Sequence, residues 1–160
     1  MVKVVVIYDS KTGNTELMAQ AVAEGAKSVE GTTVLVQKLG TKWPVSLLKD
    51  ADAVIVGSPT RYGNITQELT EFFQTMNYLQ KSERVVLKGK KGAAFGSYGW
   101  DGGWNTAHIE DELKVLGVNL VAAAVSAVDQ LGAMKEKISK ADLAKCRELG
   151  KKVANAATKK

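Results

Sequence analysis

Residues 4–15 read VVVIYDSKTGNT, and this stretch of the chain decides the fold class. Its first part, Val4–Tyr8, is apolar and mostly β-branched, which is typical of a strand that is covered on both faces of a parallel sheet. The polar residues Asp9–Thr15 follow, and an apolar stripe with helical spacing begins at Leu17. A buried strand, a polar turn and a helix in this order predict the first unit of an alternating α/β domain.

The same alternation continues along the whole chain. Further strands are expected at Thr33–Gln37, Ala53–Gly57, Gly92–Gly96 and Val118–Ala124. Apolar residues with helical spacing lie within residues 17–22, 65–76, 109–116 and 143–153, and a short helix is expected at Val45–Lys49. The pattern has no linker or repeat. It therefore predicts a single domain, residues 1–160, in which helices cover both faces of a doubly wound, five-stranded parallel sheet.

Composition limits the class of protein further. Of the 160 residues, 45% are hydrophobic and 24% are charged, which is typical of a folded globular domain. No apolar run is long enough for a membrane helix and no secretory signal precedes the first strand, so neither a membrane nor export is expected. The single cysteine, Cys146, cannot form an internal disulfide, which favours a reducing cytoplasm. The only histidine, His108, is expected at the surface, and no zinc or iron–sulfur site is expected.

The net charge of +5 is concentrated late in the chain. Residues 135–160 carry nine lysines and arginines against three acidic residues, whereas residues 1–134 carry thirteen against fourteen. The basic segment is either the solvated face of a helix or a docking surface for an acidic partner. Because it has no interleaved aromatic residues and no motif of nucleic-acid readers, binding to nucleic acid is not expected.

Ligands of doubly wound sheets bind beyond the carboxyl ends of the strands, so three loops are candidates for a site. They are residues 9–15, 58–64 and 97–104, and all three are rich in glycine, hydroxyl and aromatic residues. The first loop offers the hydroxyls of Ser10, Thr12 and Thr15 at a helix N-terminus, where free N–H groups and the helix dipole favour a phosphate. A polar helix cap would use the same residue types, but three hydroxyls and an asparagine within six residues exceed what a cap needs.

The motifs that are missing restrict the kind of phosphate. The chain has no G-x-x-x-x-G-K-[ST] sequence, which excludes a Walker-type triphosphate site, and no G-x-G-x-x-G fingerprint of dinucleotide-binding domains. A receiver domain needs an acidic residue at the end of the third strand, where this chain has Gly57-Ser58-Pro59. A phosphate monoester remains as the expected ligand of the first loop.

Residues 10–15, Ser10-Lys11-Thr12-Gly13-Asn14-Thr15, resemble the T/S-x-T-G-N-T phosphate loop of flavodoxins, and the resemblance extends over essentially the whole chain. The chain is similar to the short-chain flavodoxins, because its last strand carries no insertion. The resemblance implies a flavodoxin-like fold with strand order 2-1-3-4-5 and FMN as the cofactor. It also implies that the six residues of this loop bind the phosphate. Because the backbone amides already serve as donors, the Lys11 side chain is expected to point outward.

The second loop resembles the corresponding loop of two other groups of flavoproteins. Pro59-Thr60-Arg61-Tyr62-Gly63-Asn64 is similar to a segment in the flavodoxin domain of flavodiiron proteins and in NAD(P)H:quinone oxidoreductases like the tryptophan-repressor-binding protein. The resemblance implies that Tyr62 stacks on the isoalloxazine ring. It also implies that Gly63 presents its peptide to flavin N5, where a glycine can change its peptide orientation. Arg61 has no counterpart in typical flavodoxins, and it either neutralises the reduced flavin or faces solvent.

The third loop, Ser97-Tyr98-Gly99-Trp100-Asp101-Gly102-Gly103-Trp104, is similar to the S-Y-G-W-x-G loop of flavodiiron proteins. The resemblance implies a cofactor-binding loop that includes Ser97, Tyr98, Gly99, Trp100, Gly102 and Gly103. Trp100 is expected to cover the second face of the flavin, with Tyr98 as the other candidate for that position. Trp104 is expected to begin the next helix and to pack in the core.

No catalytic nucleophile, general base or metal site accompanies these loops in the sequence, so the flavin itself is expected to supply the chemistry. We expect a low-potential one-electron carrier that is a monomer or a weak dimer. Its expected partners are redox proteins such as iron–sulfur proteins, flavin reductases or flavodiiron-type oxidases. The alternative is an FMN-dependent NAD(P)H:quinone oxidoreductase, which the second loop supports, although such enzymes carry a longer segment after the fourth strand.

Overall fold

The computed structural model describes residues 1–11, 13–40, 45–60, 64–99, 104–128 and 138–159. Strands and helices alternate in this part of the chain, as the sequence predicts. In chain order they are β1 (Val2–Tyr8), α1 (Asn14–Lys27), β2 (Thr32–Lys38), α2 (Val45–Lys49), β3 (Ala53–Pro59), α3 (Gln67–Lys81), β4 (Lys91–Tyr98), α4 (Asn105–Val115), β5 (Asn119–Leu120), β6 (Val125–Val128) and α5 (Lys140–Thr158).

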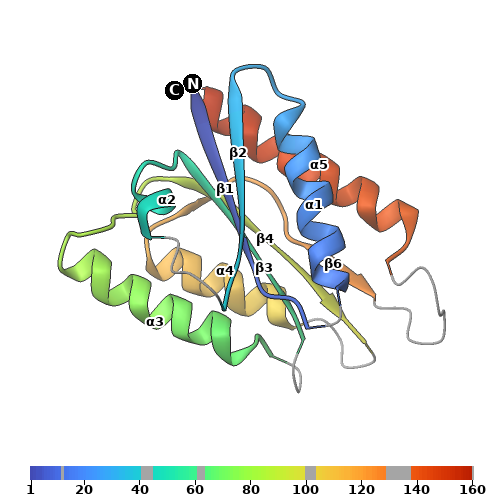
Figure 1. Ribbon diagram of the computed structural model, residues 1–160, viewed down its shortest axis with the longest axis horizontal. Helices are drawn as coiled ribbons and strands as arrows, with labels where there is room; N and C mark the ends of the chain where they lie inside the picture. The colour runs from blue at the N-terminus through green and yellow to red at the C-terminus, as the bar shows by residue number, and fades with distance from the viewer. Residues whose placement is uncertain (12, 41–44, 61–63, 100–103, 129–137, 160) are drawn as a thin grey trace.

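Helices α1 and α5 cover one face of the sheet, and α3 and α4 cover the other (Figure 1). Alternate residues of the strands supply the two cores. In β1, Val4 and Val6 pack in the layer of α1 and α5, whereas Val5 and Ile7 pack in the layer of α3 and α4. The sheet is covered on both sides, which explains why its strands read as continuous apolar runs. None of the described helices combines the length and the apolar composition needed to cross a membrane.

All strand pairs of the sheet are parallel, and the strand order is β2-β1-β3-β4-β5, which confirms the predicted fold class and order. The expected last strand, Val118–Ala124, is wrong in its extent. Two short strands stand in its place, because β5 pairs with Lys91 and Gly92 of β4 whereas β6 pairs with Phe95–Tyr98. Residues 121–124 lie between these two pairings, where β4 has only residues 93 and 94, so the edge of the sheet is interrupted there.

Two glycines let α1 and α5 approach each other closely. A Cβ atom at Gly25 of α1 would lie 1.7 Å from the Arg147 carbonyl oxygen of α5, and one at Gly150 would lie 1.9 Å from the Val22 carbonyl oxygen. No larger residue fits at either position unless a helix moves, because the interior is close-packed. An ion pair between Arg147 and Glu24, at 3.8 Å, also joins these helices. Helix α1, which begins at the candidate phosphate loop, is therefore packed directly against α5.

Candidate functional site

The three candidate loops lie at one edge of the sheet. The strands β1, β3 and β4 end at residues 8, 59 and 98, and Tyr8 pairs with Gly57 while Pro59 pairs with Ser97. Because these strands are parallel, their carboxyl ends and the loops that follow meet at the same edge. Segments from distant parts of the sequence are therefore neighbours at the place where the sequence predicts a ligand.

The first loop turns around the hydroxyl of Ser10. Its Oγ atom accepts hydrogen bonds from the backbone N–H of Gly13, at 3.1 Å, and of Glu16, at 3.3 Å. The Ser10 N–H donates to Oδ1 of Asp9 at 2.9 Å, which fixes the start of the turn. Gly13 has a φ of 94°, in the left-handed region that other residues rarely occupy. The backbone of this loop therefore requires a glycine at this position.

Helix α1 starts at the end of this loop with Gly13 as its cap residue, which has no side chain to close the first turn. A Cβ atom at Gly13 would meet no other atom within 4 Å, so the loop borders open space there. Asn14 and Thr15 follow as buried polar residues. A helix N-terminus with short hydroxyl side chains is a good anion site, and the donors of this loop fit a phosphate monoester.

Hydrogen bonds join the first and second loops to the third. The hydroxyls of Thr15 and Ser97 lie 2.9 Å apart, and both side chains are buried. Thr60 binds the same residue twice, because its N–H and its hydroxyl donate to the Ser97 carbonyl oxygen at 2.9 and 2.8 Å. Ser97 thus connects residues that are 82 and 37 positions away in the sequence. The described residues of the three loops form one hydrogen-bonded unit.

Asn105, which sequence reasoning missed, holds the bases of the second and third loops together. Its Nδ2 atom donates to the carbonyl oxygens of Ser58, at 2.7 Å, and of Ser97, at 3.4 Å. The side chain is fully buried, and a Cβ atom at Gly96 would lie 2.5 Å from Nδ2, so a glycine is needed opposite it. Within the described ranges its buried Oδ1 atom has no hydrogen-bond partner. An acceptor is therefore available at the base of the loops that are expected to hold the ligand.

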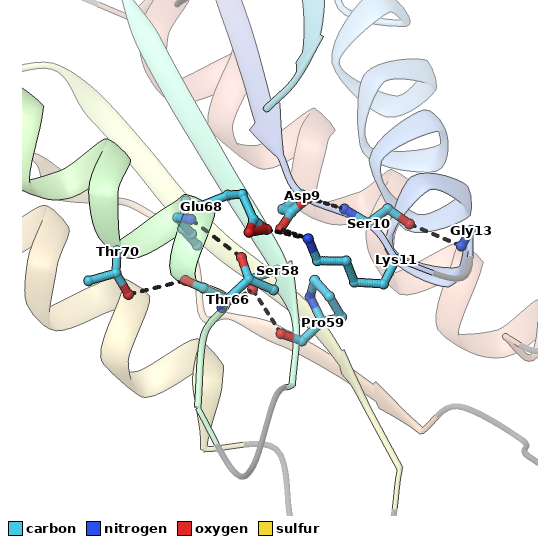
Figure 2. Close-up of polar contacts among 10 residues, drawn as sticks. Asp9, Ser10, Lys11, Gly13, Ser58, Pro59, Thr66, Glu68 and Thr70 are labelled. Atoms are coloured by element: carbon cyan, nitrogen blue, oxygen red, sulfur yellow. Dashed lines mark hydrogen bonds and ion pairs between the residues drawn. The ribbon is translucent and has the colours of Figure 1, made fainter. Parts of the chain in front are cut away.

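Ser58 and Thr66 connect the end of β3 to the start of α3, as Figure 2 shows. The Ser58 hydroxyl accepts from the Thr66 N–H at 3.3 Å and donates to the Pro59 carbonyl oxygen at 2.8 Å. The Thr66 hydroxyl in turn accepts from the Leu69 N–H at 3.3 Å and caps the first turn of α3. The start of α3 is therefore fixed relative to the carboxyl end of β3.

The Lys11 side chain is exposed, in line with the expectation that it points outward, but its ammonium reaches across to α3 (Figure 2). Its Nζ atom forms an ion pair with Oε2 of Glu68, in the first turn of α3, and lies 3.5 Å from Oδ2 of the buried Asp9. The hydrogen bond from Lys11 to Glu68 raises the pKa of the ammonium, which favours its charged form. Lys11 is therefore engaged by two carboxylates.

Tyr8 binds the acidic residue in the first turn of α1. Its hydroxyl donates to Oε1 of Glu16 at 2.9 Å, and its side chain is buried. Burial, together with this hydrogen bond, raises the pKa of Tyr8 to about 12. The phenol therefore stays protonated and keeps donating to Glu16 well above neutral pH.

The structure also describes two residues outside the predicted cofactor set. His108 lies at the surface, as expected, where its Nδ1 atom is hydrogen-bonded to Oδ1 of Asn64 and its Nε2 atom lies 3.7 Å from Oε1 of Glu112. Trp104 is the cap residue of α4, as expected for the start of a helix, but 71% of it is exposed. The expected core packing of Trp104 is wrong, because α4 turns Ile109 to the core instead.

The structure brings the described members of the predicted site together at the carboxyl edge of β1, β3 and β4. These members are Ser10, Lys11, Gly13, Asn14, Thr15, Pro59, Thr60, Asn64, Ser97, Tyr98 and Gly99. The other predicted members lie outside the described residues, and they are Thr12, Arg61, Tyr62, Gly63, Trp100, Gly102 and Gly103. The expected stacking of Tyr62 and Trp100 therefore stays a prediction.

Known proteins of similar sequence point to one family. A family model described as Flavodoxin matches residues 6–150 of the chain. A flavodoxin of Aquifex aeolicus (strain VF5) is 34% identical over 164 residues, which cover 96% of this chain and 86% of that protein.

Solved structures of similar fold include a flavodoxin from the domain Archaea, with a TM-score of 0.79, 29% identity and coverage of 98% of this chain and 99% of that one. Rubredoxin oxygen:oxidoreductase of Desulfovibrio gigas aligns with a TM-score of 0.82 and 31% identity over 98% of this chain. The alignment covers 36% of that larger chain, so this chain spans about a third of its length. With a family match over most of its residues and a relative aligned over nearly its full length, this chain belongs to the flavodoxin family of flavin-binding electron-transfer proteins.

Proposed function

We propose that this chain binds one FMN at the carboxyl ends of β1, β3 and β4 and carries single electrons between redox proteins. The observation that carries the proposal is the hydrogen-bonded unit of three loops around Ser97, next to the open N-terminus of α1. A site that is organised before its ligand arrives loses little conformational freedom on binding. Such a site favours a cofactor that is held tightly and stays bound.

The first loop would hold the phosphate. The N–H groups at the start of α1 and the hydroxyls of Ser10 and Thr15 are donors of the right kind, and the helix dipole favours the negative charge. Thr12 is proposed as a third hydroxyl donor because it lies between Ser10 and Thr15 in the sequence. The role of this loop is therefore binding and not catalysis.

The second and third loops would hold the ring. Tyr62 and Trp100 are proposed to stack on its two faces, and Gly63 is proposed to face N5. A bound flavin supplies the electron transfer, and the protein binds, orients and shields it. Asn105 and Ser97 join the described ends of both loops by hydrogen bonds, which supports a binding site at this place.

The proposed partners are iron–sulfur proteins, flavin reductases or flavodiiron-type oxidases. The likeness to rubredoxin oxygen:oxidoreductase supports the last of these classes, because this chain aligns with one part of that protein. The alternative is an NAD(P)H:quinone oxidoreductase. Turnover of NADH with a quinone at rates on the order of 10 per second would favour that alternative.

A comparison of FMN with riboflavin tests the proposed function. Flavin-free protein is titrated with each flavin, and binding is followed by the loss of flavin fluorescence. Because hydrogen bonds to a charged group contribute about 1.5–3 kcal/mol each, FMN should bind at least about 100-fold more tightly than riboflavin. Equal affinities would contradict the phosphate role of the first loop.

The two tryptophans of the third loop, Trp100 and Trp104, form a matched pair for testing the ring site. Trp100→Ala should weaken flavin binding and raise the residual fluorescence of the bound flavin, since a stacked indole quenches it. Trp104 is 71% exposed, so Trp104→Ala should change neither property and should alter the free energy of unfolding by only about 0.5 kcal/mol. The opposite pattern would make Trp104 the stacking residue.

A further inference from the structure

Lys11 joins the phosphate loop to the first turn of α3, although its partner Glu68 lies 57 residues later in the sequence (Figure 2). The Lys11 Nζ atom and the Glu68 Oε2 atom form an ion pair, and 37% and 36% of the two side chains are exposed. A pair that is partly shielded from water is stronger than a fully solvated one, because solvent screens it less. The contact therefore restrains the phosphate loop relative to α3.

The other partner of Lys11 is a buried carboxylate. Only 3% of Asp9 is exposed, its Oδ1 atom accepts from the Ser10 N–H at 2.9 Å, and its Oδ2 atom lies 3.5 Å from the Lys11 Nζ atom. Oδ2 has no hydrogen-bond partner in the part of the chain that the structure describes. A buried carboxylate without compensation is costly, and the Lys11 ammonium is placed where it can supply that compensation through electrostatic attraction.

A lysine in a phosphate loop would ordinarily be assigned as a direct ligand of the phosphate, because it carries a point charge that suits this group. Here the ammonium already contacts Glu68 and Asp9. If Lys11 turned fully toward a phosphate, the buried Asp9 carboxylate would lose this cation. The contacts that are present therefore favour a positioning role for Lys11 over direct binding of the phosphate.

We propose that Lys11 is a positioning residue whose contacts with Glu68 and Asp9 hold the phosphate loop in the shape that accepts a phosphate, without Lys11 binding the phosphate itself. We call these three residues the strap. The inference rests on the proposed function, because it assigns a specificity role within the same site. The strap acts on the loop around Ser10, so it selects FMN over riboflavin, which has no phosphate.

Amide hydrogen exchange in the flavin-free protein tests the strap without any cofactor. The reporters are the N–H groups of Gly13 and Glu16, which donate to the Ser10 hydroxyl. Both strap variants should speed the exchange of these two N–H groups. Glu68→Gln, which breaks only the exposed contact, should speed it about fivefold, and Lys11→Met, which breaks both contacts, should speed it by more. Lys151→Met, on the exposed side of α5, is the control and should leave both rates unchanged. Unchanged rates in both strap variants would overturn the proposal.

The change of FMN affinity in Glu68→Gln distinguishes the strap from direct phosphate binding, because the two roles of Lys11 predict opposite changes. Glu68→Gln breaks the strap, so FMN should bind about fivefold more weakly while riboflavin is unaffected. If Lys11 were a phosphate ligand, the same change would free its ammonium and FMN would bind more tightly, which would overturn the proposal. The double variant Lys11→Met/Glu68→Gln should be no weaker than Lys11→Met, because both changes remove one interaction.

A rescue variant tests the compensation of Asp9. Asp9→Asn keeps the Oδ1 acceptor of the Ser10 N–H but removes the charge, so Lys11→Met/Asp9→Asn should regain the part of the exchange protection that Lys11→Met loses beyond the loss in Glu68→Gln. A further loss of protection in this variant would contradict the role of Lys11 toward Asp9. If the protein binds neither flavin, the proposed function fails, and the exchange rates still decide whether the strap exists.

Discussion

Helices α1 and α3 both begin at the carboxyl edge of the sheet, but their first turns are closed in different ways. In α3 the cap residue is Thr66, and its own hydroxyl accepts from the Leu69 N–H at 3.3 Å. In α1 the cap residue is Gly13, and the hydroxyl that accepts from the first turn belongs to Ser10, three positions earlier. A cap from its own position closes a helix end tightly. A hydroxyl from earlier in the chain makes the backbone curve and leaves space at the glycine.

The acidic residues in both first turns nevertheless contact residues at or just after the end of β1. Glu16 of α1 accepts a hydrogen bond from Tyr8, at the end of β1, and Glu68 of α3 is paired with Lys11, three residues later. Acidic residues in a first turn stabilise a helix through its dipole, but a free carboxylate there would also repel a phosphate. The end of β1 therefore supplies partners to the acidic residues of both helices. The difference between the helices lies in the cap and not in the charge.

The largest expected effect comes from giving the open helix end a side chain. Gly13→Ala should cost about 1–2 kcal/mol of unfolding free energy, because the left-handed conformation is strained for any other residue, and it should weaken FMN binding strongly. Gly31 is the matched control, since it has a φ of 79° and equally open surroundings between α1 and β2. Gly31→Ala should show the same loss in urea unfolding with no change in FMN affinity. If both variants lost FMN affinity equally, affinity would follow global stability and not the loop.

A smaller effect is expected from removing one hydroxyl at each helix end. Ser10→Ala and Thr66→Ala should each cost about 1 kcal/mol of unfolding free energy, since each removes a cap. Only Ser10→Ala should lower the ratio of FMN to riboflavin affinity, because only α1 is proposed to face the phosphate. Thr66→Ser keeps the hydroxyl and serves as the conservative control. A fall of the ratio in Thr66→Ala would remove the distinction between the two helix ends.

The smallest effect on flavin binding is expected at Tyr8, whose contribution is visible in the pH dependence of stability. Its pKa is about 12 in the folded protein, against 10.0 for an unperturbed tyrosine, so the stabilisation is complete below pH 10 and is lost as the pH rises toward 12. The unfolding free energy of the natural protein should therefore fall more steeply between pH 10 and pH 12 than that of Tyr8→Phe. Curves that run parallel over this range would contradict the raised pKa that burial and the hydrogen bond to Glu16 give Tyr8.

The fold could be predicted because strand and helix periods are local signals, and each apolar run is long enough to carry one. The interrupted edge at β5 and β6 could not. Residues 118–124 are mostly Val and Ala, and these side chains suit a paired strand and an unpaired segment equally well. The interruption comes from the register against β4, in which the four residues 121–124 lie opposite only residues 93 and 94. Register depends on the partner strand, so it cannot be predicted from the residues of this segment alone.

The candidate site divides in the same way. The turn around Ser10 and Gly13 spans a few residues, so its chemistry is visible in one short stretch of sequence. The contacts of Asn105 with Ser58 and of Lys11 with Glu68 join residues 47 and 57 positions apart. Neither Asn105 nor Glu68 stands out in its own segment, because both polar residues are ordinary at the start of a helix. Only the packing of the strands makes them part of the site.

The close contact of α1 with α5 also has a consequence during synthesis. The two glycines that permit it, Gly25 and Gly150, leave the ribosome far apart in time, since chains grow at about 5–20 residues per second. For a period on the order of ten seconds, α1 therefore has the strands of the sheet, but not α5, as packing partners. A chain arrested before α5 should expose the apolar surface that α5 covers in the finished protein, and surface of this kind is what chaperones bind.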